Sequence, residues 1–153
     1  MTPIPLEASD AAACAGLHAR CFDRPWSAAE IADLIEGPGA IALRTPDGDP
    51  HGFVLARALV GEAEILTVAV DPARRGAGIG RALIEAAADA ARAAGAQTLF
   101  LEVAVDNAPA LALYAATGFR RAGFRPRYYA RPGGERVDAL VFARDLNTGP
   151  SGD

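Results

Sequence analysis

The feature that most constrains the fold is a glycine-rich turn between an apolar strand and a long alanine-rich helix. Residues 64–70 are rich in isoleucine, leucine and valine and predict a strand, which Asp71 and Pro72 end. Residues 79–94 then predict a helix, and residues 98–103 predict a further strand. This order predicts a parallel βαβ crossover with the glycine turn at its first junction.

The rest of the chain predicts more strands than helices around this unit. Further strands are expected at residues 4–7, 40–44, 52–58 and 137–144, and helices at residues 10–22 and 108–117 and after Ser27. Ser27 and Glu30 match a capping box, and Asn107 is a candidate helix cap. The order predicts an α/β (α+β) fold with a mixed sheet. Residues 1–146 are expected to form one domain and residues 147–153 a flexible C-terminal tail.

Charge and composition restrict the partners of this chain. It has 153 residues, of which 51% are apolar, and a formal net charge of −4. A mildly acidic chain favours a cationic substrate over a nucleic acid, so no direct nucleic-acid partner is expected. No charged start precedes an apolar run, and no apolar run is long enough to cross a bilayer, so neither a signal peptide nor a membrane partner is expected. Two cysteines without a CxxC pattern fit a reducing compartment, the cytoplasm.

All fifteen strongly basic residues are arginines, and lysine is absent. This excludes a Schiff-base lysine, the phosphate-binding lysine of P-loops and the strand lysine of kinases.

The glycine turn, residues 74–81, has the character of an anion site. Its glycines allow the backbone close to a ligand, and the amides that begin the following helix point outward with the helix dipole behind them. Arg74, Arg75 and Arg81 add charge-assisted donors. A pyrophosphate group fits this set. A tight turn without a ligand is the alternative, and a dinucleotide fingerprint is disfavoured because the spacing is G-x-G-x-G rather than G-x-G-x-x-G.

The pattern Arg75-x-x-Gly78-x-Gly80 resembles the acetyl-CoA motif of the GNAT superfamily of N-acetyltransferases. The likeness extends over residues 4–146 and includes the order of elements. Within the superfamily the chain is most similar to the RimI type, the ribosomal-protein alanine N-acetyltransferases. The residues that carry this likeness are Pro25-Trp26-Ser27, Leu101-Glu102-Val103, Asn107, Leu113-Tyr114, Gly118-Phe119 and Tyr128-Tyr129.

The resemblance implies a mostly antiparallel sheet with a central splayed parallel strand pair and helices on both faces. It implies acetyl-CoA as the acetyl donor and no metal. The coenzyme pyrophosphate is expected on the glycine turn, and its pantetheine arm is expected beside the strand of residues 65–70 and Asn107. The residues expected to hold acetyl-CoA are therefore Leu66, Val68, Val70, Arg75, Gly76, Ala77, Gly78, Ile79, Gly80, Arg81, Asn107 and Tyr114. For Asn107, a role as a helix cap alone is the alternative, and it can also cap the helix and contact the pantetheine arm.

Glu102 and Tyr114 are the candidate base and acid. An amine attacks a thioester only when neutral, and an α-amine with a pKa near ~8 needs a weaker base than a lysine near ~10.4. Glu102 lies in an otherwise apolar strand, where a buried charge is costly; a solvent-facing glutamate at a sheet edge is the alternative. The resemblance implies that Tyr114 faces the thioester sulfur, whereas without the resemblance a core tyrosine with its hydroxyl satisfied is favoured.

Three aromatic residues, Trp26, Tyr128 and Tyr129, are candidates to line a peptide channel, with ordinary packing as the alternative. The two tyrosines are expected in a loop before the last strand. Cys14, His18 and Cys21 share a helix face, for which core packing is favoured over a metal site.

Three functions remain open at this point. The first is acetylation of a protein N-terminal α-amine, as on the alanine of a small-subunit ribosomal protein, by direct transfer in a ternary complex. The second is acetylation of a small-molecule amine, and the third is a non-catalytic acyl-CoA-binding module. The oligomeric state is left undetermined by the sequence.

Overall fold

A computed structural model describes residues 1–147 of the chain. The predicted tail falls almost entirely on residues 148–153, outside the described part. The described elements are β1 (Ile4–Pro5), α1 (Ala11–Cys21), α2 (Ala28–Glu36), β2 (Ala40–Arg44), β3 (Gly52–Leu59), β4 (Glu62–Val70), α3 (Ile79–Ala93), β5 (Thr98–Ala104), α4 (Ala108–Ala116), β6 (Arg120–Ala130) and β7 (Arg136–Asp145). Short 3₁₀ turns lie at Ala8–Asp10 and Pro72–Arg74.

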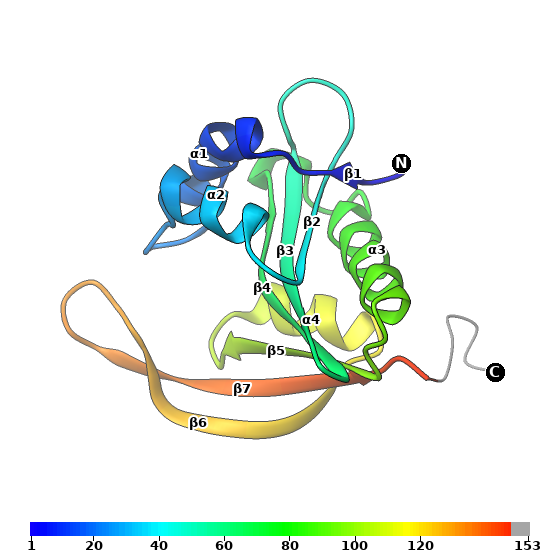
Figure 1. The fold of residues 1–153 in the computed structure, drawn as a ribbon. Helices are drawn as coiled ribbons and strands as arrows, with labels where there is room; N and C mark the ends of the chain where they lie inside the picture. The colour runs from blue at the N-terminus through cyan, green and yellow to red at the C-terminus, as the bar shows by residue number, and fades with distance from the viewer. Residues whose placement is uncertain (148–153) are drawn as a thin grey trace.

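One seven-stranded sheet runs through the molecule in the order β1-β2-β3-β4-β5-β7-β6. Among the described strands, β4 and β5 are the parallel pair and the other neighbours are antiparallel. Helix α3 crosses between β4 and β5, as the βαβ pattern predicts (Figure 1). The predicted fold class, a mixed sheet with helices on both faces, is confirmed.

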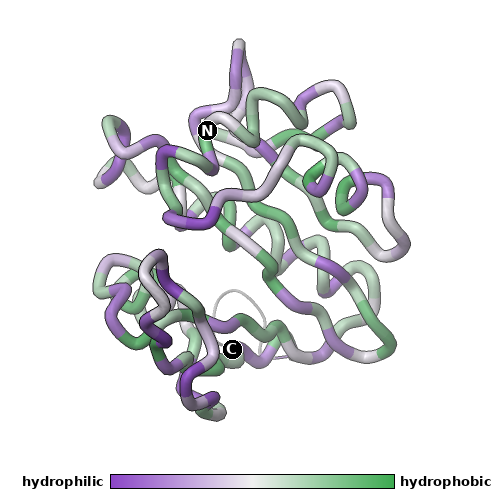
Figure 2. The backbone as a smooth tube through the Cα atoms, turned by 90° about the vertical axis from the view of Figure 1, so that its left-hand side faces the viewer, coloured by the Kyte–Doolittle hydropathy of each residue, from purple (hydrophilic) through white to green (hydrophobic). Residues whose placement is uncertain are grey.

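The two faces of the sheet carry separate cores. Val54 of β3 packs with α3 and α4, whereas its neighbours Phe53 and Leu55 pack with α1 and α2. This alternation is the period of two that a strand buried on both sides requires. The alanines of α3 bring that helix close to the sheet, and Leu83 and Ile84 are fully buried there. Figure 2 shows apolar chain running through the interior and the hydrophilic β2–β3 turn at the top.

Local sequence signals begin and end the helices where predicted. In the capping box of α2, Ser27 Oγ accepts from the Glu30 amide and Glu30 Oε1 accepts from the Ser27 amide, each at 3.1 Å. Asn107 caps α4 by accepting the Ala110 amide at 3.3 Å. Gly95 follows α3 with a φ of +91°, a left-handed conformation that favours glycine.

Strands β4 and β5 separate after a short parallel ladder, as predicted. Their register pairs only Glu62–Glu64 with Thr98–Phe100. Just beyond, β4 pairs Ile65 and Thr67 with consecutive residues of β3, so Leu66 is the extra residue of a β-bulge. The bulge bends β4, while β5 continues beside β7. This separation opens the middle of the sheet.

The structure corrects one element. Residues 120–130 form the edge strand β6, so Tyr128 and Tyr129 lie in a strand rather than in a loop. The sequence concealed it because most of the strand is exposed on both sides and Pro126 interrupts it. Irregular pairing between Arg121 and Gly123 and between Arg125 and Tyr129 further removes any alternation. We call β6 and β7 together, residues 120–145, the arm; it extends beneath α1 and α2 in Figure 1.

Candidate active site

A cavity of about 450 Å³, the donor cavity, lies over the glycine turn. It is lined by Cys21, Phe22, Val68, Ala69, Val70, Arg74, Arg75, Gly76, Gly78, Ile79, Gly80, Arg81, Asn107, Pro109, Ala110, Leu113 and Tyr114. Of the twelve residues predicted to hold acetyl-CoA, Ala77 and Leu66 are not in its lining; Leu66 lines the neighbouring cavity instead.

The backbone of the glycine turn fits a bound diphosphate. Gly76 and Gly78 have φ values of +87° and +81°, and a Cβ built on either meets no atom within 4 Å. Gly78 is the N-cap of α3, whose first helical hydrogen bond runs from the Ala82 amide to the Gly78 carbonyl, so the preceding amides are directed toward the cavity end of the helix. Gly80 serves packing instead, because a Cβ there would lie 3.0 Å from Leu113.

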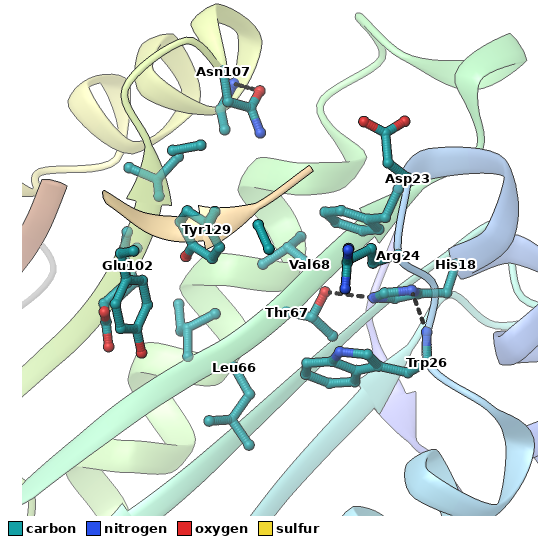
Figure 3. A pocket seen from close by; sticks show the side chains of 18 of the residues that line it. His18, Asp23, Arg24, Trp26, Leu66, Thr67, Val68, Glu102, Asn107 and Tyr129 are labelled. Carbon is teal, nitrogen blue, oxygen red and sulfur yellow. Dashed lines mark hydrogen bonds between the residues drawn. The ribbon is translucent and has the colours of Figure 1, made fainter. Parts of the chain in front are cut away.

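A second cavity of about 470 Å³, the acceptor cavity, lies where β4 and β5 separate (Figure 3). It is lined by His18, Phe22, Asp23, Arg24, Trp26, Ile65, Leu66, Thr67, Val68, Leu101, Glu102, Val103, Ala104, Asn107, Ala110, Tyr114, Tyr128, Tyr129, Ala130 and Arg131. The two cavities share Phe22, Val68, Asn107, Ala110 and Tyr114. A molecule in the donor cavity therefore meets one in the acceptor cavity beside Tyr114.

Glu102 of β5 presents a carboxylate to the acceptor cavity. Its side chain is 16% exposed, and Arg125 Nε lies 3.0 Å from Oε2. The Arg125 N–H does not point at that oxygen, which is buried and accepts no hydrogen bond from the described residues. Because the Arg125 side chain is 55% exposed, the ion pair is solvent-screened and easily exchanged. The carboxylate thus lies in the wall of the cavity with one oxygen, Oε2, that is held by an ion pair and not by a hydrogen bond.

Two tyrosines lie within the electrostatic reach of Glu102. Burial, and then the negative charge of Glu102, raise the pKa of Tyr129 to about 12. The Glu102 charge is the main cause that raises the pKa of Tyr128. Figure 3 shows Tyr129 and Glu102 on the same side of the cavity. Both phenols therefore stay protonated at neutral pH and can donate hydrogen bonds.

Tyr114 lies at the junction of the two cavities, 8% exposed, with its ring edge-on to Phe119 at 5.7 Å. Burial is the main cause that raises its pKa to about 12, with a smaller contribution from Tyr129. The phenol is therefore protonated at neutral pH, as an acid must be before it acts. The structure thus places Tyr114 in the lining of both cavities, and its catalytic role stays a prediction.

An ion-pair cluster, the clasp, lies beside the acceptor cavity, whose lining includes two of its members, Arg131 and Asp23. Arg131, in the turn of the arm, has Nη2 2.6 Å from Asp106 Oδ1 and Nη1 3.6 Å from Asp23 Oδ2. Asp23 belongs to the α1–α2 loop and Asp106 to the β5–α4 turn, so three distant segments meet here. Sequence spacing gave no signal for this contact.

His18 is a further cavity residue, for which the sequence offers core packing or, less favoured, a metal site with Cys14 and Cys21. It is 2% exposed and makes hydrogen-bond contacts with Thr67 and with the amide of Trp26, as the dashed lines in Figure 3 mark. The favoured core-packing interpretation of its helix face agrees with the complete burial of Cys14. No cluster of three or more metal-ligating side chains occurs within residues 1–147.

The fold and the two joined cavities define an acyl-transfer enzyme. Residues 11–119 match the acetyltransferase (GNAT) family, and the chain belongs to that family. This confirms the predicted class, an acetyl-CoA-dependent N-acetyltransferase.

Named relatives extend over nearly the whole chain. It is 40% identical over 147 residues to the N-alpha-acetyltransferase RimI of Mycobacterium tuberculosis, covering 92% of this chain and 89% of that protein. It is 35% identical over 143 residues to the ribosomal protein bS18-alanine N-acetyltransferase of Escherichia coli, covering 93% and 95%.

Solved structures give the same likeness. The crystal structure of the Escherichia coli ribosomal-protein alanine N-acetyltransferase has a TM-score of 0.85 at 34% identity, covering 95% of this chain and 93% of that one. The Arabidopsis thaliana NAA60 structure in complex with acetyl-CoA has a TM-score of 0.84 at 22% identity, covering 95% and 98%, and shows the shared fold. The predicted resemblance to RimI-type enzymes is confirmed.

Proposed function

We propose that this chain transfers the acetyl group of acetyl-CoA to the N-terminal α-amine of a protein, and that the acceptor is the N-terminal alanine of a small-subunit ribosomal protein. The observation that carries the proposal is the junction of the donor and acceptor cavities beside Tyr114, with the Glu102 carboxylate on the acceptor side. The names of the relatives at 35–40% identity support the choice of acceptor.

The proposed reaction is a direct transfer within a ternary complex. The pyrophosphate lies on the amides and arginines of the glycine turn, which directs the thioester along β4 to the junction. The amine loses a proton to Glu102, directly or through a water molecule, and its lone pair attacks the acyl carbon. A C–N bond forms and the C–S bond breaks, and the Tyr114 hydroxyl gives its proton to the departing sulfur. The second proton of the attacking nitrogen passes to the Tyr114 oxygen, so the products are a neutral amide and the thiol of CoA.

An α-amine suits the base that the site offers. At pH 7, neutralising a group with a pKa near ~8 costs about 1.4 kcal/mol, against roughly 4.6 kcal/mol for a lysine. A single carboxylate in a largely apolar wall is sufficient for the smaller task. The acceptor chain beyond its first residue would leave the cavity beside the clasp of Arg131, Asp23 and Asp106, whose side chains are partly exposed.

A ribosomal-protein acceptor would place the reaction in the cytoplasm. The described part of the chain contains no helix both long and apolar enough to cross a bilayer.

The test compares three acceptors with purified protein and acetyl-CoA. The acceptors are a short peptide beginning with alanine, the same peptide formylated at its N-terminus, and a panel of small amines, followed by thiol release and mass spectrometry. We expect the free peptide alone to be acetylated efficiently, at its α-amine. Equal activity on the blocked peptide, preference for a small amine, or acetyl-CoA binding without turnover on any amine would each overturn the proposal.

A further inference from the structure

The two ring nitrogens of His18 have defined roles. The Trp26 amide donates to Nδ1 at 3.1 Å, so Nδ1 carries no proton. In the neutral ring the proton must then be on Nε2, which lies 3.1 Å from Thr67 Oγ1. Burial holds the pKa of His18 down to about 4, so the ring is neutral at physiological pH. His18 Nε2–H therefore donates to the Thr67 oxygen.

The ring is also fixed in orientation. Phe22 stacks on His18 with centroids 4.3 Å apart, and Trp26 stacks with centroids 5.1 Å apart. Both planes lie within about 24° of the imidazole plane. Rotation of the imidazole would break both hydrogen bonds and both stacks, so its Nε2–H stays directed at Thr67.

This arrangement sets the direction of the Thr67 hydroxyl proton. A hydroxyl has one donor and two acceptor positions, and the side facing His18 is used to accept. The Thr67 proton must therefore point elsewhere, and no acceptor for it is found in the described part of the chain. Thr67 is 7% exposed and lines the acceptor cavity, but not the donor cavity. A buried hydroxyl with an unpaired proton there is a preformed donor.

The Leu66 bulge explains why this hydroxyl faces the acceptor. Before the bulge, Ile65 packs on the α3 side of the sheet, whereas after it Thr67 turns to the α1 side. Val68 takes the α3 side and lines both cavities. Thr67 is thus directed away from the glycine turn and toward the side where Trp26 and Arg24 lie (Figure 3).

We propose that Thr67 and His18 form a carbonyl-recognition subsite: Thr67 Oγ1–H donates to the first carbonyl oxygen of the acceptor, and His18 is the positioning residue that aims it. The inference rests on the proposed function, because an α-amine acceptor of a peptide has a carbonyl two bonds from its nitrogen and a simple amine does not. The subsite selects an amine followed by an amide.

The experiment measures KM and kcat separately for an alanine-starting peptide. Loss of a neutral hydrogen bond to substrate predicts a rise in KM of about fivefold to tenfold in Thr67→Val, with kcat within about twofold of the wild type. Thr67→Ser keeps the hydroxyl and should restore KM. Thr98→Val, on β5 and outside both the donor and the acceptor cavity, is the matched control and should behave as the wild type.

Two further measurements separate recognition from a general disturbance of the cavity. Isopropylamine has the same branched amine as alaninamide without the carbonyl, so the slow turnover expected for it at high concentration should be equal in Thr67→Val and in the wild type. His18→Phe should raise the peptide KM by the same factor as Thr67→Val, and the double variant should add nothing, since the two residues act on one hydrogen bond.

An unchanged peptide KM in Thr67→Val, a loss seen in kcat alone, or an equal loss with isopropylamine would overturn the subsite while leaving N-terminal acetylation intact. Failure of the wild-type protein to acetylate the peptide would instead overturn the proposed function, and the subsite with it.

Discussion

The donor cavity is lined mostly by one continuous stretch, residues 68–81, whereas the acceptor cavity collects side chains from five separate segments. The donor cavity is a local structure, because its strand, three glycines and helix N-terminus follow one another directly in the chain. The acceptor cavity exists only when the α1–α2 loop, the separated strands and the arm come together. The comparison predicts that donor binding and acceptor recognition can be damaged independently.

Substitution of Glu102 should give the largest loss of activity with no loss of donor binding. Glu102→Gln removes the proposed base and should lower kcat/KM by roughly 10²–10⁴-fold, the usual contribution of general base catalysis. Calorimetry should show unchanged CoA affinity, because Glu102 lines the acceptor cavity and not the donor cavity. A matched loss of CoA binding would mean that the two sides are coupled. Glu64→Gln, a carboxylate that lines a neighbouring cavity of about 320 Å³, is the control and should leave kcat/KM nearly unchanged.

The second test uses acid, to which the two sides should respond differently. The folded-state pKa of His18 is lowered from 6.5 to about 4 by burial, against a smaller opposite effect of Glu30. The unfolded chain therefore binds a proton on His18 that the folded chain does not. The contribution of the neutral His18 to the free energy of unfolding is therefore fully present above pH 6.5. It is lost as the pH drops from 6.5 to 4, by up to about 3 kcal/mol. No histidine lines the donor cavity.

Urea unfolding of the wild type and of His18→Gln, at pH 7 and pH 4.5, checks this assignment. The variant has no imidazole at this position, so its stability should decline less between the two pH values. If both proteins lose stability in parallel, other groups cause the acid sensitivity and His18 is not held neutral by burial.

The same contrast explains what could be predicted from sequence. The glycine turn, the βαβ unit, the Ser27 box and the Asn107 cap depend on residues close together in the chain, and all are present as expected. The separation of β4 from β5 was expected from family resemblance, but the Leu66 bulge behind it left no sequence signal.

The misses belong to the acceptor side. Strand β6 was missed because an edge strand lacks a buried face and so lacks alternation. The sequence relates His18 only to its helix neighbours Cys14 and Cys21, because its hydrogen-bond partner Thr67 lies 49 positions away in the chain. The Arg131 clasp likewise joins residues that only the folded arm brings together.

Tyr114 lines both the donor and the acceptor cavity, so a variant of it tests the place where the two cavities meet. Tyr114→Phe keeps the ring and its edge contact with Phe119 but removes the proton donor. A hydrogen bond to a charged leaving group is worth about 1.5–3 kcal/mol, so kcat should fall roughly 10–100-fold. Because its pKa is about 12, the wild-type rate should show no loss from Tyr114 ionisation up to pH 10. A pH profile with an alkaline decline near pH 9 that disappears in Tyr114→Phe would contradict this.

The smallest effect is expected on the donor side alone. Gly78 and Gly61 have nearly equal φ values, +81° and +78°, and a Cβ on either meets no atom within 4 Å. Alanine at either position therefore costs a similar strain of about 1–2 kcal/mol in stability. Only at Gly78 would the added methyl stand in the space of the donor cavity, so Gly78→Ala should raise the Kd for CoA about tenfold while Gly61→Ala leaves it unchanged. Isothermal titration with CoA, alongside thermal unfolding of both variants, makes the comparison. Equal CoA affinity in the two variants would mean that the glycine turn does not hold the coenzyme.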